Sequence, residues 1–182
     1  IAIKMIKKYN FTTGDLAAGI KECIDNINHK ILEKGRNISD CKGMGTTLTL
    51  GVINENHLVI GHVGDSRAYL YHNGVLKQIT DDHSYVADLL KRGVITREEA
   101  KNHPKKNLLL RALGLEEEIQ VDIIQKRIAK GDVLLLCSDG LTNMKSDNQI
   151  ESVLSKNLKL QDQAQLLSDK ANAAGGYDNI TA

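Results

Sequence analysis

The chain has 182 residues, of which 41% are apolar and 26% charged, and this composition is typical of a globular domain of ordinary size. Its 24 Lys and Arg against 23 Asp and Glu leave a net charge of +1, which favours neither a nucleic-acid partner nor a membrane surface. No apolar run is long enough to predict a membrane span. Three widely spaced cysteines form no metal-binding pair and favour a reduced, cytoplasmic setting.

The first predicted element is an amphipathic helix over residues 13–34. Apolar residues recur there at steps of three and four, which places them in one stripe on a helix surface. We expect Gly35 to end the helix. The stripe comprises Leu16, Ile20, Cys23, Ile24, Ile27 and Ile31.

Segments rich in β-branched and apolar residues follow and predict strands. Asn73-Gly74 joins two of them, and Asn-Gly is the strongest short signal for a hairpin. We therefore expect an antiparallel meander. The predicted strands are residues 46–53, 57–63, 67–71 and 75–80.

Residues 81–103 predict two short helices inserted between strands, the second opened by a capping box at Thr96 and Glu99. We interpret this insert as a flap. After it the sheet is expected to resume. The remaining predictions are strands at residues 121–128 and 133–137, a helix capped by Ser146, a helix at residues 161–174 and the start of a strand at residues 180–182.

Three aspartates lie where predicted strands begin or end. Asp65 falls in a tight reversal between two strands, Asp139 directly follows an apolar strand, and Asp178 comes just before the last predicted strand. Several such carboxylates, if they converge, form an oxygen-ligand site suited to Mg²⁺ or Mn²⁺. An Asp beside Gly is also a common turn former that binds its own backbone, and the spacing leaves both interpretations open.

Other reactive side chains indicate chemistry less strongly. No pair of histidines has the spacing of a zinc motif. His103, just before Pro104, suits the end of a short helix better than a role in proton transfer. Cys137 is expected to be buried and inert, because no Gly-rich anion cradle with an Arg follows it.

A set of short motifs carries a family resemblance. The motifs are Gly43-Met44-Gly45-Thr46-Thr47, Gly61-His62-Val63-Gly64-Asp65-Ser66-Arg67-Ala68-Tyr69, Ile79-Thr80-Asp81-Asp82-His83-Ser84, Leu110-Arg111-Ala112-Leu113-Gly114, Leu136-Cys137-Ser138-Asp139-Gly140-Leu141 and Gly176-Tyr177-Asp178-Asn179-Ile180-Thr181. In content and order they resemble those of the metal-dependent protein Ser/Thr phosphatases of the PPM family (type 2C), bacterial branch.

The resemblance implies an α+β fold, a four-layer α-β-β-α sandwich of two antiparallel sheets. One catalytic domain would cover residues 1–182, with a flap at about residues 81–106. The implied reaction is hydrolysis of phosphoserine and phosphothreonine in proteins by a metal-activated water, with two or three Mn²⁺ or Mg²⁺ ions. The flap favours the type that opposes Ser/Thr kinases over a stress-response phosphatase. We therefore expect a cytoplasmic monomer whose phosphoprotein partners include a Ser/Thr kinase.

The family's roles transfer to individual residues of this chain. Asp139 and Asp178 resemble the catalytic ligands of the paired metal centre, and Asp65 with Asp139 resembles the ligands of a third metal. Asn107 lies where some bacterial members add a contact to that third metal. The motif residues expected to act structurally are Arg67 and Asn179.

Part of the family's pattern is missing. The family's first strands carry an Arg, an acidic residue and an Asp-Gly-x-Gly-Gly-His segment. This sequence has no stretch that corresponds to these N-terminal motifs. We interpret the chain as a fragment that lacks the N-terminal strands, and we expect weak or absent hydrolysis from the 182 residues as written. The alternatives are a non-catalytic pseudophosphatase or regulatory binding module of the same fold, or a metal-binding domain of unrelated chemistry.

Overall fold

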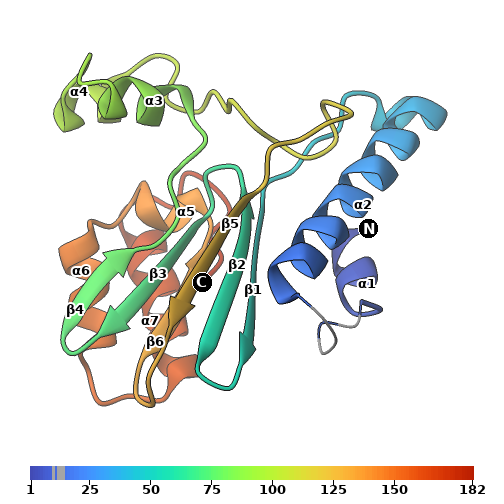
Figure 1. Cartoon of the computed structure of the whole chain (residues 1–182). Helices are drawn as coiled ribbons and strands as arrows, with labels where there is room; N and C mark the ends of the chain where they lie inside the picture. Colours follow the sequence, from blue (N-terminus) through green and yellow to red (C-terminus); the bar gives the residue numbers. More distant parts are fainter. Residues whose placement is uncertain (10, 12–14) are drawn as a thin grey trace. The chain divides into compact units, whose positions relative to one another are not determined.

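The computed structural model describes residues 1–9, 11 and 15–182, which fall into two compact units (Figure 1). The first unit comprises Ile1–Gly64 and Asp82–Arg127, and the second comprises Asp65–Asp81 and Ile128–Ala182. Each unit contains a three-stranded antiparallel sheet and its own helices. The predicted α+β class with two antiparallel sheets is therefore confirmed. No helix in the described part of the chain is both long and apolar enough to span a bilayer.

The first unit is built on the sheet β1-β2-β5, in which both neighbouring pairs are antiparallel. In this register His62 lies opposite Asp122. The elements of the unit are α1 (Ala2–Ile6), α2 (Leu16–Asn37), the 3-10 helix η1 (Ser39–Cys41), β1 (Leu48–Asn54), β2 (His57–Val63), α3 (Tyr85–Lys91), α4 (Arg97–Asn102) and β5 (Asp122–Arg127).

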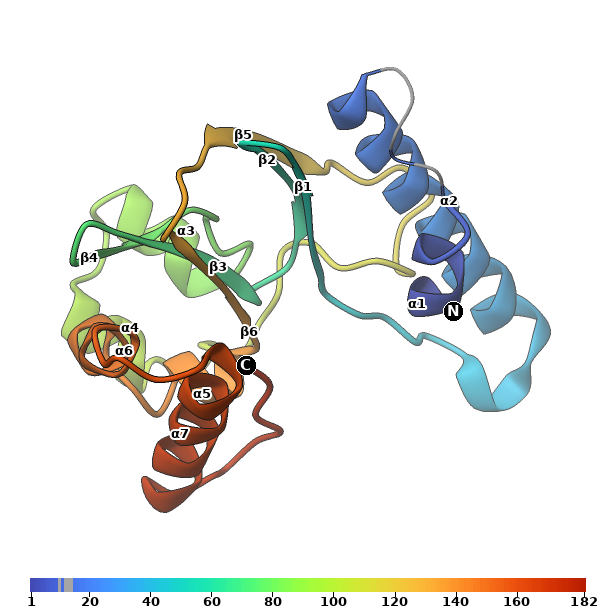
Figure 2. The ribbon, with the colours of Figure 1, turned by 90° about the horizontal axis from the view of Figure 1, so that it is seen from below.

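Helix α2 buries its apolar stripe against this sheet, with α2 lying along one face (Figure 2). The predicted stripe is confirmed by a core cluster in which Ile20, Ile24 and Ile27 are fully buried. Asp15 caps the helix by accepting hydrogen bonds from the N–H groups of Ala17 and Ala18. The predicted start at residue 13 lies outside the described residues.

The predicted stop at Gly35 is wrong, because α2 continues to Asn37. A glycine inside a helix costs only about 1 kcal/mol relative to alanine, which is too little to end a helix held by its apolar face. A Cβ at Gly35 would lie 3.2 Å from the backbone oxygen of Cys41. The glycine therefore allows the 3-10 turn after α2 to pack closely on the helix.

The insert contains the two predicted short helices, α3 and α4. Ser84 caps α3, and Thr96 and Glu99 form the predicted capping box of α4. The chain on both sides of the insert is joined at its base, where the N–H of Tyr85 donates to the oxygen of Leu108. An isolated bridge between residues 84 and 109 continues this pairing.

The second unit has the sheet order β4-β3-β6, again antiparallel throughout. Asn73 and Gly74 form the predicted hairpin, with φ of 49° and 84°, the left-handed values that such a turn requires. The elements of the unit are β3 (Arg67–His72), β4 (Val75–Gln78), β6 (Val133–Cys137), α5 (Asp139–Thr142), α6 (Asp147–Leu154) and α7 (Leu160–Ala173).

The predicted meander is wrong in one respect, since β2 and β3 belong to different sheets. The chain turns at Gly64, where φ is +115° and an added Cβ would lie 2.3 Å from Cγ2 of Thr47. This turn, a conformation that glycine adopts without steric cost, ends the pairing between consecutive strands. No strand is assigned at residues 180–182, where one was predicted.

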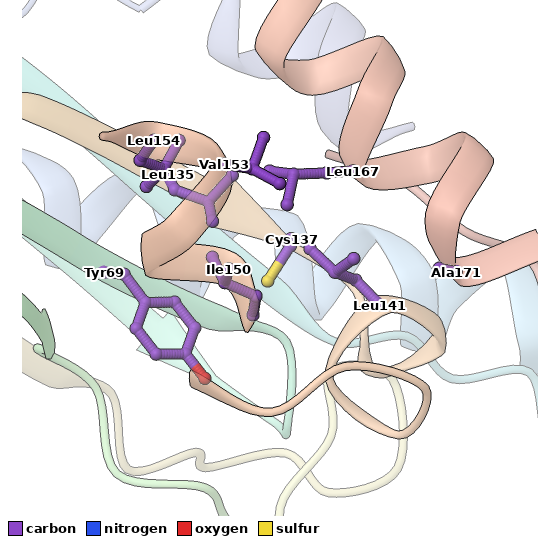
Figure 3. Close-up of a cluster of buried hydrophobic side chains, with 9 residues drawn as sticks. All are labelled: Tyr69, Leu135, Cys137, Leu141, Ile150, Val153, Leu154, Leu167 and Ala171. Carbon is purple, nitrogen blue, oxygen red and sulfur yellow. The ribbon is translucent and has the colours of Figure 1, made fainter. Parts of the chain in front are cut away.

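The core of the second unit lies between its sheet and the helices α6 and α7. Figure 3 shows Cys137 beside Ile150 and Leu141 within this cluster. Cys137 is 5% exposed, which agrees with the expectation of a buried thiol. Ser146 and Gln149 form the capping box that opens α6.

Candidate active site

The ladder between β3 and β6 brings Asp65 and Asp139 to the same end of one sheet. Its last pair joins Arg67 to Cys137. Asp65 precedes Arg67 by two residues and Asp139 follows Cys137 by two, so at that end Asp65 lies in the bend before β3 and Asp139 is the first residue of α5. Both residues are half-buried. The position of each is therefore set by the backbone pairing of the central strand β3 with the edge strand β6.

The segment that carries Asp178 is tied to the turn before Asp139 by Ser138. The N–H of Ser138 donates to the oxygen of Thr181 (3.1 Å), and its hydroxyl donates to the oxygen of Asn179 (3.1 Å). The N–H of Thr181 donates back to the Ser138 hydroxyl (3.0 Å). Figure 2 shows the chain's C-terminus beside the end of β6. Asp178 therefore lies in a segment attached to the strand end from which Asp139 extends.

Gly140 makes this attachment possible. A Cβ at residue 140 would lie 2.4 Å from the backbone oxygen of Asn179, far inside ordinary contact. Only a residue without a side chain allows the two backbones to approach so closely. The glycine after Asp139 is therefore required for close packing of the two backbones, in addition to any role in forming a turn.

The aspartates also make the local contacts that a turn former makes. Oδ1 of Asp178 accepts from the N–H of Asn179 at 2.7 Å, and Oδ2 of Asp139 accepts from Nδ2 of Asn143 at 3.2 Å. These bonds leave other carboxylate lone pairs available, since an ionised carboxylate has about four acceptor positions. The turn interpretation and the ligand interpretation are therefore compatible for both residues.

The donor set fits a hard divalent cation in chemistry but not in number. All three candidate ligands are carboxylates, the oxygen donors that Mg²⁺ and Mn²⁺ prefer. Over residues 1–9, 11 and 15–182, however, no three His, Cys, Asp or Glu side chains lie close enough together to form a metal-binding group. The assignment of Asp65, Asp139 and Asp178 as ligands stays a prediction.

The residues expected to act structurally, Arg67 and Asn179, make hydrogen bonds near the strand ends, and their structural roles stay predictions. Nη1 of Arg67 donates to the hydroxyl of Tyr69 (3.0 Å), which donates to Oδ1 of Asp147 (3.1 Å). Burial raises the pKa of Tyr69, so this hydroxyl stays protonated at neutral pH. Asn179 supplies the N–H bonded to Asp178 and the oxygen bonded to Ser138.

The flap residues noted in the sequence lie in the first unit. His103 follows α4 as its C-cap and accepts from the N–H of Lys105 (3.0 Å), and its ring packs at a tilt against that of Tyr85 with centroids 5.6 Å apart. The expectation of a hydrogen-bonded residue at the end of a short helix is confirmed. Asn107 is exposed in the turn after α4, and its predicted metal contact stays a prediction.

Sequence reasoning missed a polar group in the first unit, formed by His83, Arg111 and Asp122. Nε2 of His83 lies 3.1 Å from Oδ2 of Asp122, and Nη1 of Arg111 donates to the other oxygen at 2.9 Å. His83 is 6% exposed. Two of the three belong to motifs quoted above, but Asp122 is 39 residues from His83. The β2–β5 register places Asp122 opposite His62, and the ring of His83 packs against that of His62.

Comparisons with known proteins agree with the motif pattern. A family model described as protein phosphatase 2C matches residues 2–88. The chain is 44% identical over 170 residues to the serine/threonine phosphatase Stp of Listeria monocytogenes, covering 93% of this chain and 68% of that protein.

Solved structures extend the similarity to the fold. The crystal structure of the serine/threonine phosphatase Stp1 from Staphylococcus aureus matches with a TM-score of 0.92 and 32% identity, over 99% of this chain and 73% of that one. The catalytic domain of the serine/threonine protein phosphatase PstP, solved in complex with two manganese ions, matches with a TM-score of 0.89 and 35% identity, over 99% and 76%.

Proposed function

Because this chain belongs to the protein phosphatase 2C (PPM) family of bacterial serine/threonine phosphatases, we propose that it hydrolyses phosphoserine and phosphothreonine in proteins with the help of divalent metal ions. The observation that carries the proposal is the 44% identity to a serine/threonine phosphatase over 93% of the chain. The manganese ions in the structure of PstP support Mn²⁺ or Mg²⁺ as the cofactor. Two or three ions are proposed.

Asp139 and Asp178 are the proposed catalytic metal ligands, and Asp65 with Asp139 would hold a third ion. Bound cations would supply Lewis acidity and lower the pKa of a coordinated water. The protein's own contribution is placement. The β3–β6 ladder fixes the chain at Asp65 and at Asp139, the first residue of α5, and the three Ser138 hydrogen bonds hold the segment of Asp178. Such placement carries most of the catalytic effect in phosphoryl transfer.

The proposal extends to partners and setting. Phosphoproteins, with a Ser/Thr kinase among them, are the proposed substrates, because the family resemblance associates an insert such as α3–α4 with the kinase-opposing type. We propose a cytoplasmic monomer. None of the three cysteines is in a disulfide, which is consistent with a reducing compartment.

The experiment that tests the proposal compares Asp139→Asn with Asp162→Asn. Asp162 is an exposed residue in the first turn of α7 and serves as a matched control for the loss of one carboxylate. The measurement is Mn²⁺-dependent hydrolysis of para-nitrophenyl phosphate and of a phosphothreonine peptide. We expect Asp139→Asn to remove the Mn²⁺-dependent rate and Asp162→Asn to keep it. Equal rates in the two variants would contradict the assignment of Asp139.

One observation supports the alternative of a non-catalytic regulatory module. The described part of the chain gathers no three-ligand group, and two carboxylates hold a hard dication weakly because such ions bind through six or more oxygen ligands, including water. We therefore propose that the 182 residues hydrolyse phosphoesters weakly. Binding of a phosphopeptide without turnover at any Mn²⁺ concentration would favour the module.

A further inference from the structure

The hairpin turn between β3 and β4 holds an Asn side chain against a His ring. Asn73 and Gly74 are the two loop residues of this turn, and both are exposed. Nδ2 of Asn73 lies 2.9 Å from Nε2 of the preceding His72. Because an amide nitrogen only donates, Nε2 of His72 accepts this hydrogen bond and the ring proton lies on Nδ1. The amide nitrogen of Asn73 therefore contacts the basic nitrogen of an imidazole.

A carboxylate orients the imidazole from its other side. Nδ1 of His72 donates to Oδ1 of Asp132 at 2.5 Å. The two residues meet at one end of the sheet β4-β3-β6, next to the ladder pair of Tyr71 and Val133 (Figure 1). Oδ2 of Asp132 accepts from the N–H of Ala129 at 2.9 Å. This bond, together with the one from His72, holds the pKa of Asp132 below its usual value.

The three side chains thus form a line of carboxylate, imidazole and amide within the second unit. The side chain of Asp132 is only 8% exposed, whereas that of His72 is 50% exposed. A fixed, ionised carboxylate stabilises the protonated form of the imidazole bonded to it. An imidazole in that position can accept a proton and deliver it to the group on its other side. In this hairpin the group on the other side is the amide nitrogen of Asn73.

The residue after Asn73 leaves its side chain open to attack. The backbone nitrogen of glycine reaches the Cγ atom of a preceding Asn without hindrance from a side chain of its own. Asn73 is the only Asn in the sequence that precedes a Gly. An added Cβ at Gly74 would meet no atom within 4 Å among the described residues beyond its neighbours in the chain. The Gly74 peptide therefore has open space in which to turn toward Cγ of Asn73.

We propose that Asn73 is a site of deamidation that the His72–Asp132 pair assists. The backbone nitrogen of Gly74 forms a bond to Cγ of Asn73 and gives up its proton to Nε2 of His72. His72 passes a proton to Nδ2 as the bond between Cγ and Nδ2 breaks, so Nδ2 leaves as ammonia and a cyclic succinimide remains. Water then adds to either carbonyl carbon of the succinimide and opens it to aspartate or isoaspartate. Water is consumed, ammonia is released, and nothing is oxidised or reduced.

The products change the hairpin in charge and in backbone length. Either product places a new carboxylate beside Asp132. Isoaspartate also runs the main chain through the side-chain carbon, which lengthens a loop whose two residues need left-handed φ values of 49° and 84°. We therefore expect conversion of Asn73 to weaken the pairing of β3 with β4. The inference is independent of the proposed function, because none of its residues is a proposed metal ligand.

Two variants and a matched control isolate the contribution of the imidazole. His72→Gln removes the ring and keeps a hydrogen-bonding side chain, and Asp132→Asn keeps the shape of the carboxylate without its charge. Asn56 is the internal reference, because it is exposed in the two-residue loop between β1 and β2 and is followed by His57 instead of Gly. His57→Gln is the matched control for the loss of one exposed imidazole.

The experiment incubates the whole 182-residue chain and its variants at neutral pH and follows each Asn by peptide mass spectrometry, with isoaspartate distinguished by fragmentation. In the folded parent we expect Asn73 to convert before Asn56. His72→Gln should slow the conversion of Asn73 by at least about tenfold, because general acid–base assistance commonly contributes that much or more. Asp132→Asn should slow it by a smaller factor, and His57→Gln should match the parent.

The same chains unfolded in guanidinium separate the effect of the fold from that of the local sequence. Unfolded parent and unfolded His72→Gln should convert at equal rates, and unequal rates would overturn the structural explanation. The proposal is also overturned if Asn73 of the folded parent stays intact while the unfolded parent converts, or if folded His72→Gln converts at the parental rate. Should His72→Gln fail to fold, a parental rate in folded Asp132→Asn overturns the role of the pair.

Discussion

Gly140→Ala tests whether the segment of Asp178 depends on close contact with the turn of Asp139. The added Cβ would lie 2.4 Å from the oxygen of Asn179 and 3.0 Å from its carbonyl carbon. Ordinary contact begins near 3.4 Å, so the Asn179 peptide has to move by about 1 Å. A displacement of that size breaks the three hydrogen bonds that Ser138 makes with Asn179 and Thr181.

Three hydrogen bonds at about 1 kcal/mol each make the expected loss of docking free energy about 3 kcal/mol, or on the order of a hundredfold in the docked population. The free energy of unfolding should fall by less, because alanine favours helix α5 by up to about 1 kcal/mol. The assay is amide hydrogen exchange at Ser138 and Thr181, combined with Mn²⁺ affinity. Gly19→Ala in α2, where an added Cβ meets only a 3.7 Å contact, is the control. Equal protection of Thr181 in the two variants would refute the reasoning.

Three further predictions concern stability. Leu141→Ala removes most of a fully buried side chain and should lower the free energy of unfolding by about 2–5 kcal/mol. The control Leu158→Ala changes a side chain that is 45% exposed and should alter that free energy by less than about 1 kcal/mol. Urea unfolding measures both variants. Asn28→Ala leaves the buried N–H of Gly114 without its 2.7 Å partner and should cost about 1–3 kcal/mol, measured in the same way. Asp122 has a lowered pKa in the folded chain, so its contribution to stability is present above the unfolded pKa and is lost as pH falls through the folded one. Stability of Asp122→Asn should therefore fall less than that of the parent on acidification below about pH 5, as urea titrations at several pH values would show.

Much of the secondary structure could be predicted because its signals are local. The Asn73-Gly74 hairpin, the capping boxes of α4 and α6, and the stripe on α2 each depend on residues within a few positions of one another. The sheet to which a strand belongs is not local. β2 and β3 are separated by three residues, yet the turn at Gly64 sends them to different sheets.

The candidate site was predictable only in part for the same reason. Strand ends could be located, so Asp65 and Asp139 could be singled out. Asp65 and Asp139 lie at the same end of the sheet because of the β3–β6 register. The segment of Asp178 is attached there by hydrogen bonds between Ser138 and residues about 40 positions away in the sequence. The contact of His83 with Asp122 likewise joins residues far apart in the sequence, because the β2–β5 register places Asp122 opposite His62, against which His83 packs. No spacing rule within a single sequence encodes these contacts.

The distinction between a weak phosphatase and a non-catalytic relative depends on how many ligands a cation meets at this end of β3 and β6. Each carboxylate that binds directly replaces part of the ion's hydration, and an ion held by two carboxylates keeps most of its water and exchanges readily. A weak enzyme of this kind gives a rate that rises with Mn²⁺ concentration without saturating, and loss of Asp139 removes that rise. A regulatory module gives no rate at any concentration. The dependence of rate on Mn²⁺, more than the rate at one concentration, therefore separates the two functions.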